Sequence, residues 1–89
     1  MAADRLTIDP ATVFDNAEQD RVEFAADAGD DRYAFAILYD ALRALSGVDP
    51  VTEPVALFDQ YRDRIAEIGT TALARDQAQD IVVISENDL

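Results

Sequence analysis

The most constraining feature of this sequence is the segment 52–75, whose apolar side chains recur with the spacing of a helix. These side chains follow one another at intervals of three and four residues, which places them on one stripe of a helical surface. The residues between them are mostly charged or polar and can face water. We therefore predict one long helix over 52–75 that packs on the rest of the chain through Phe58, Tyr61, Ile65, Ile68 and Ala72.

Local signals support this helix and suggest where it begins. Thr52 is a suitable N-cap, with Glu53 and Pro54 in the first turn, where an acid and a missing N–H are both tolerated. We expect Val55 to extend the apolar stripe backwards. Gly69 is unfavourable inside a helix, so we expect a close approach of its backbone to the sheet.

Two segments before this helix alternate as strands do. In residues 21–26 every second side chain is apolar, and a second alternating run occupies residues 32–38. The segment 27–31 between them is rich in Asp and contains Gly29, as turns often are. These runs predict a β-hairpin with one face formed by Val22, Phe24, Ala26, Tyr33, Phe35 and Ile37.

The second strand of this hairpin is apolar on its other face as well. Ala34, Ala36 and Leu38 lie there, and we expect Val82 or Ile84 to join them. A strand that is apolar on both faces is usually covered on both. The N-terminal segment 12–14 or another subunit would supply the cover, and we expect a homodimer formed through this second face.

The remaining segments complete an α+β pattern. Residues 12–14 predict a short strand, and 15–20 a polar loop. Residues 40–47 predict a short helix that ends at a glycine, and the β-branched run 81–84 predicts a buried strand. We predict one domain over residues 1–89: a small antiparallel sheet, made of the hairpin, the C-terminal strand and an N-terminal strand, packed on one face by a short and a long helix.

Particular residues in this order resemble a known family. They are Leu42 and Leu45 after the hairpin, the pattern Phe58-Asp59-x-x-Arg62-x-x-Ile65, and the run 81–84 leading into Asn87-Asp88-Leu89. From about Val22 to Leu89 the chain is similar to the small bacterial family called domain of unknown function 1488. The resemblance implies an α+β fold and a bacterial, intracellular setting. It implies no activity, cofactor or catalytic residue.

The charge of the chain limits its partners. Seven Arg and no Lys stand against 19 Asp and Glu, which gives a net charge of −12. Such a chain repels phosphate backbones and anionic membrane surfaces, so we expect no nucleic-acid and no membrane partner. The acids are scattered, which favours a role in solubility or adaptation to a salty cytoplasm. An acidic face that binds a basic partner or mimics a nucleic acid remains the alternative.

The residue types also limit the chemistry. The chain has no His and no Cys, so it lacks the commonest general base, the commonest zinc ligands and a thiolate nucleophile. The three carboxylates Asp27, Asp30 and Asp31 match no calcium-loop spacing, and Asp is common in hairpin turns. We predict no catalytic, cofactor-binding or metal-binding residue, and no cofactor.

Other polar and aromatic residues have structural interpretations. Asp59 and Arg62, and likewise Arg64 and Glu67, are i,i+3 neighbours that favour ion pairs on a helix. Tyr33 and Tyr61 lie on apolar faces and are expected to pack in the core. Arg43 complements the dipole at the end of the short helix. Ser46 and Ser85 lie in no nucleophile motif.

These observations favour a non-enzymatic protein that self-associates or binds another protein. An acidic regulator of a basic or nucleic-acid-binding partner is the alternative, and a carboxylate-dependent enzyme is less favoured. The N-terminal sequence MAADRLTIDP lacks the basic and apolar regions of a signal peptide. Together with the absence of cysteine, this leads us to expect a cytoplasmic protein.

Overall fold

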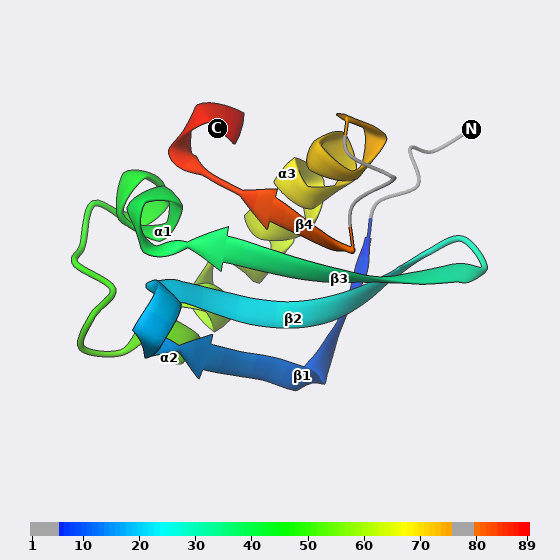
Figure 1. Cartoon of the computed structure of the whole chain (residues 1–89). Coiled ribbons are helices and arrows are strands. Elements are labelled where there is room, and N and C mark those ends of the chain that lie inside the picture. Colours follow the sequence, from blue (N-terminus) through cyan, green and yellow to red (C-terminus); the bar gives the residue numbers. More distant parts are fainter. Residues whose placement is uncertain (1–5, 76–79) are drawn as a thin grey trace.

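The protein forms two layers, a four-stranded sheet and a layer of helices on one of its faces. The computed structural model describes residues 6–75 and 80–89. Its strands are ordered β1-β2-β3-β4 across the sheet. Figure 1 looks onto the face that carries no helix, with α2 and α3 behind the sheet. The α+β class predicted from the sequence is confirmed.

The hairpin at the centre of the sheet is confirmed. It consists of β2 (Arg21–Ala28) and β3 (Asp31–Leu38), paired antiparallel from Arg21 opposite Leu38 to Ala28 opposite Asp31. Gly29 has a φ of 64°, a left-handed conformation that glycine adopts without strain. Strand β1 (Thr7–Asn16) pairs antiparallel with β2 and is much longer than the predicted strand at 12–14.

The prediction of a wholly antiparallel sheet is wrong at its last strand. β4 (Ile81–Ile84) is confirmed as a strand, but it pairs with β3 in parallel, with Phe35 opposite Val82 and Ile37 opposite Ile84. Between β3 and β4 the chain passes through the helical layer. A crossover of that length lets it return in the same direction, as parallel pairing requires.

The short helix was placed correctly. Helix α1 spans Tyr39–Ser46, and Gly47 ends it in the left-handed conformation, donating its N–H to the carbonyl of Arg43 at 2.7 Å. Two short 3-10 helices lie elsewhere, η1 (Ala17–Gln19) within the predicted loop and η2 (Glu86–Asp88) after β4.

The predicted long helix is two helices, α2 (Pro54–Gln60) and α3 (Arg62–Arg75). Thr52 is not the N-cap, because Pro54 occupies the first helical position, which proline favours. The N-cap is therefore Glu53, whose side chain makes no capping hydrogen bond.

The break between α2 and α3 falls at Tyr61, where φ is −108° and ψ is 19°. The N–H of Tyr61 lies between the carbonyls of Leu57 and Phe58, at 3.2 and 3.1 Å, as in a tightened last turn. Helix α2 packs against α1, β1 and β2, whereas α3 packs mainly against β4. Because the sheet twists, we attribute the break to the need for each half to follow a different part of it.

The core lies between the sheet and the helices. The ring of Phe24 stacks on Phe35 with centroids 5.2 Å apart, and Phe58 tilts against Phe24 at 4.9 Å. The predicted stripe is mostly confirmed, since Phe58, Ile65, Ile68 and Ala72 are buried and Tyr61 is partly buried. Val55 does not extend it, because it lies in the first turn of α2 and is 40% exposed.

The close approach expected at Gly69 is confirmed. A Cβ atom at this position would lie 2.6 Å from Cδ1 of Leu6, just before β1, and 3.6 Å from the ring of Phe35. The neighbouring Thr70 hydroxyl accepts the N–H of Leu6 at 3.2 Å. The glycine therefore lets α3 approach the start of β1 and the centre of the sheet.

A bulge in β1 reverses which side chains face the helices. Ile8 pairs with Ala26 on the helix side, but the register shifts after Asp9, and Phe14 pairs with Glu23 on the other side. The irregular residues begin at Pro10, which has no N–H to donate to the sheet. Regular alternation would have placed Phe14 in the core. The bulge instead turns it onto the face without helices, as bulges commonly do.

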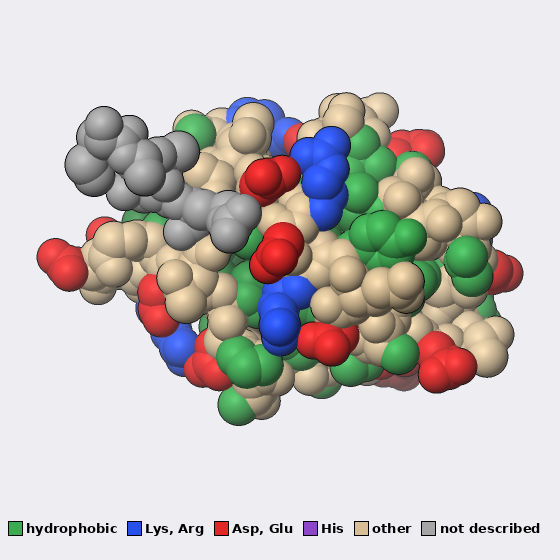
Figure 2. Space-filling view, turned by 180° about the vertical axis from the view of Figure 1, so that it is seen from behind, with side chains coloured by type: hydrophobic (Ala, Val, Ile, Leu, Met, Phe, Trp, Pro, Cys, Tyr) green, Lys and Arg blue, Asp and Glu red, His purple; other side chains and the backbone are tan. Residues whose placement is uncertain are grey.

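The helical side carries both signs of charge. Figure 2 shows acidic and basic side chains interspersed among separate hydrophobic patches on this side. Arg62 pairs with Asp59 at 3.0 Å and Arg64 with Glu67 at 3.2 Å, as the spacing predicted. Among residues 6–75 and 80–89, no helix has the length and apolar character needed to cross a membrane.

Candidate functional site

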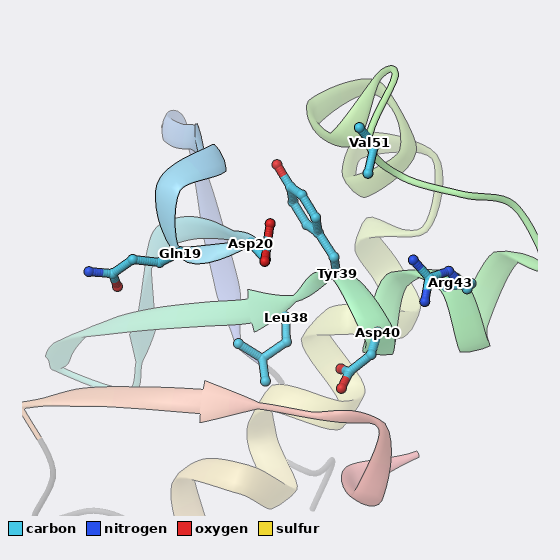
Figure 3. Close-up of a pocket in the computed structure, with 7 residues that line it drawn as sticks. All are labelled: Gln19, Asp20, Leu38, Tyr39, Asp40, Arg43 and Val51. Atoms are coloured by element: carbon cyan, nitrogen blue, oxygen red, sulfur yellow. The ribbon is translucent and has the colours of Figure 1, made fainter.

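A pocket of about 460 Å³ opens where β3 passes into α1 (Figure 3). Asp20, which follows η1, lines it on one side, and Val51 from the segment before α2 lines the other. The N–H of Tyr39 donates to the carbonyl of Asp20 at 2.9 Å, which joins the start of α1 to the chain before β2. The remaining lining residues are Gln19, Leu38, Tyr39, Asp40 and Arg43.

The Tyr39 side chain in this pocket is buried and held by a hydrogen bond. Its hydroxyl donates a hydrogen bond to Oδ1 of Asp15 in β1. Burial, followed by the bond to Asp15, raises the pKa of Tyr39 to about 12. The phenol is therefore neutral at physiological pH and already committed to a carboxylate, which makes it unsuitable as a base or nucleophile.

The two carboxylates of the pocket do not converge. Figure 3 shows Asp20 beside the Tyr39 ring and Asp40 on the other side of the chain, pointing away from the Tyr39 hydroxyl. Oδ1 of Asp40 is buried without a hydrogen-bond partner among the described residues, and its charge lies in the first turn of α1, where the helix dipole favours it. The two carboxylates therefore do not face each other across the pocket.

Of the three carboxylates near the hairpin turn, Asp27 makes an ion pair across the strands and the other two are exposed. Asp27 pairs with Arg32 across the two strands at 3.2 Å, whereas Asp30 lies in the exposed turn and Asp31 is the exposed first residue of β3. Over residues 6–75 and 80–89, no group of three or more acidic residues is arranged to hold a metal ion.

The serines and tyrosines have structural roles. The Ser46 hydroxyl donates to the carbonyl of Leu42 at 2.8 Å. Ser85 caps η2, where its side chain accepts the N–H of Asn87 at 3.3 Å. Tyr33 and Tyr61 are partly buried against the core, close to their predicted role.

The second candidate site is the face of the sheet without helices, which we call the open face. Its apolar residues come from all four strands: Phe14, Ala25, Ala34, Ala36, Leu38, Ile81 and Val83. Ala36 is fully buried, and Ala25, Leu38, Ile81 and Val83 are partly buried. Phe14 is 51% exposed, and Ala34 is exposed beside it in the middle of the face. No described helix or strand lies over this surface (Figure 1).

One end of the open face carries a paired set of polar residues. Glu23 accepts hydrogen bonds from Asn16 and Arg21, both at 2.8 Å. The bond from Asn16, with that from Arg21, holds the pKa of the Glu23 carboxyl below its usual value. The charge of Glu23 is thus satisfied within the face.

The other end carries a second paired set, near the hairpin turn. Arg32 reaches Asp9 at 2.7 Å and Asp27 at 3.2 Å. The hydrogen bond from Arg32, with that from the N–H of Ala11, lowers the pKa of the Asp9 carboxyl. The open face therefore has an apolar middle between two polar ends, one where Arg21 offsets Glu23 and one where Arg32 is shared by Asp9 and Asp27.

Two details of the predicted second face are wrong. Val82 and Ile84 point into the core, because the parallel register places Val82 beside Phe35 and Ile84 beside Ile37. Ile81 and Val83 take the expected positions on the open face. The segment 12–14 does not cover that face either, since it belongs to β1 and lies within the sheet.

The sequence analysis did not predict that Phe14 is exposed on the open face. Simple alternation along β1 assigns Phe14 to the core, and only the bulge reverses this. The available signal was Pro10, because proline inside a strand marks a bulge or an edge.

Comparison with known proteins fits this fold. The family model described as "Protein of unknown function (DUF1488)" matches residues 10–85, so the chain belongs to that family. A crystal structure of a DUF1488-family protein of unknown function from Shewanella loihica PV-4 resembles it, with a TM-score of 0.67 and 18% sequence identity. The match covers 96% of this chain and 93% of that one. A search of curated proteins found no match.

Proposed function

We propose that this chain is a non-enzymatic interaction module that forms a homodimer through the open face of its sheet. The observation that carries the proposal is the apolar middle of that face, where Phe14 is half exposed and no described element covers it. An uncovered apolar sheet face on a small protein typically marks an interaction surface.

Charge favours a second copy as the partner. The chain carries −12 overall, so two copies repel unless they meet where the charge is low. On the open face Asp9, Glu23 and Asp27 are matched by Arg21 and Arg32, all of them in ion pairs. A basic partner would instead be drawn to unpaired acids, which lie elsewhere, for example at Asp30 and Asp63.

The size of the face fits a weak dimer. Four strands of four to ten residues, spaced about 4.8 Å apart, present roughly 500 Å². Two such faces would bury roughly 1,000 Å² in total, which is at the lower limit for a specific interface. We therefore expect dissociation in the micromolar range and an exchange between monomer and dimer.

Sedimentation equilibrium at micromolar concentrations tests the proposal. We expect an average mass above the 9.8 kDa of the chain that rises with concentration towards twice this value. Ala34→Glu places a charge in the middle of the open face and should return the protein to a monomer. Ala44→Glu, at an exposed position of α1, makes the same charge change and should leave the dimer intact. A monomeric parent protein, or equal effects of the two variants, would contradict the proposal.

A further inference from the structure

The open face contains a depression of about 210 Å³ next to Phe14. Small side chains line its middle, because Ala25 and Ala34 face each other across β2 and β3 and Ile81 continues the row on β4. The side chains of Thr12, Phe14 and Glu23 border it from β1 and β2. The same face therefore carries a protruding aromatic ring and, beside it, a hollow with an apolar lining.

The hollow is suited to one aromatic ring. An apolar cavity of about 150 Å³ accommodates benzene, so a depression of about 210 Å³ that is open on one side can receive a phenyl group. Phe14 is 51% exposed, and the bulge at Pro10 directs it out of the core. The burial of such a ring is among the larger contributions to a protein interface.

We propose that Phe14 of each copy fills the depression of the other copy in a two-fold symmetric dimer. This inference rests on the proposed function and specifies how the open faces meet. A two-fold axis in the plane between the sheets, passing midway between Phe14 and the hollow, exchanges the two features. Each ring then meets the partner's hollow in the same way, as a closed two-fold interface requires.

The polar ends of the face are compatible with this arrangement. Arg21 pairs with Glu23, and Arg32 pairs with both Asp9 and Asp27, so each of these charged groups already has a partner. They can border the contact without a new partner and without leaving a buried charge unpaired. The apolar residues between them form the contact, and the hollow determines how the two open faces are aligned.

Two variants remove the ring and the hollow separately. Phe14→Ala removes the ring, and we expect the dissociation constant of the dimer to rise by about tenfold or more. Ala34→Phe fills the hollow and should weaken self-association to a similar extent. Val48→Ala, in the exposed segment after α1, shortens an apolar side chain outside the face and should have no effect. Circular dichroism establishes that every variant is folded.

Mixing the two variants gives the decisive result. In a heterodimer of Phe14→Ala with Ala34→Phe, the remaining Phe14 meets the remaining open hollow, and the filled hollow faces the missing ring. We expect a 1:1 heterodimer in the mixture, detected by native mass spectrometry with one variant labelled with ¹⁵N, although each variant alone is largely monomeric.

The outcomes separate this inference from the proposed function. A dimer that is disrupted by Ala34→Glu but unaffected by Phe14→Ala would keep the open face as the interface and overturn the ring-and-hollow contact. Failure of the two variants to associate preferentially would overturn it as well. A monomeric parent protein would overturn both proposals.

Discussion

The hydroxyl of Thr12 accepts a hydrogen bond from the backbone N–H of Ala25 at 2.8 Å. It also donates to the carbonyl of Asp9 at 2.7 Å. In this way a side chain replaces the backbone partners that β2 loses where β1 bulges. The bulge is therefore hydrogen-bonded by a side chain of the bulged segment itself, and it sets the side of the sheet on which Phe14 emerges.

Removal of this hydroxyl should destabilise the fold. In Thr12→Val the shape is retained, but the N–H of Ala25 loses its acceptor, which costs about 1–3 kcal/mol for a partly buried group. Urea unfolding followed by circular dichroism measures the change. Thr12→Ser keeps the hydroxyl and is the control, for which we expect a loss of less than about 1 kcal/mol. Equal stability of Thr12→Val and the parent would show that water replaces the hydroxyl.

The second prediction concerns the buried ring of α2. Phe58 is 1% exposed and packs against Phe24, so Phe58→Ala should cost about 3–5 kcal/mol through lost burial and a residual cavity. A domain of this size has a total stability of only about 5 kcal/mol, so the variant should be largely unfolded. Ile65→Ala in α3 should cost about 2–5 kcal/mol.

Gln60→Ala is the control for this pair. Gln60 is exposed at the end of α2, and we expect its replacement to change the free energy of unfolding by less than about 0.5 kcal/mol. The same urea melts compare all three variants. Damage from Gln60→Ala equal to that from Phe58→Ala would mean that the buried side of α2 is assigned incorrectly.

The hairpin, α1 and β4 could be predicted from the sequence because their signals are local. Alternation between Arg21 and Ala26 and the glycine at position 47 each specify one element without reference to distant residues. The direction of β4 could not be predicted, since a short β-branched strand fits either orientation. The direction of β4 depends on where the chain leaves α3, and the packing of the whole fold determines that position.

The two remaining errors have non-local causes too. The helical spacing from Phe58 to Ala72 continues through Tyr61, and the nearest proline and glycine are Pro54 and Gly69, so nothing in the pattern indicates a break at Tyr61. We attribute the break between α2 and α3 to packing on a twisted sheet. For the candidate site, the apolar second side of β3 was foreseen through Ala34, whereas Phe14 was not, because one bulge reverses the alternation of β1.

The third prediction concerns salt. Six arginines of the described chain form ion pairs, for example Arg43 with Asp49 at 3.8 Å, but the acids far outnumber them. Screening of the surplus repulsion should raise the melting temperature between about 20 mM and about 500 mM NaCl. Calorimetry at one fixed protein concentration measures it. A fall in melting temperature would mean that the ion pairs contribute more than the repulsion removes.

The last prediction uses the phenol of Tyr39, whose pKa is raised to about 12 by burial and by its bond to Asp15. An unfolded tyrosine ionises near about 10. Since the folded pKa is the higher one, the stabilisation from Tyr39 is complete below about pH 10 and is lost as the pH rises towards about 12. Tyr39→Phe should be less stable than the parent at pH 7 by about 1 kcal/mol, and this difference should narrow between pH 10 and 12. The ultraviolet absorbance of tyrosinate follows the ionisation, and the transition that is absent in Tyr39→Phe belongs to Tyr39. If the parent shows this transition near about pH 10 instead, the bond from Tyr39 to Asp15 does not hold the phenol in its neutral form.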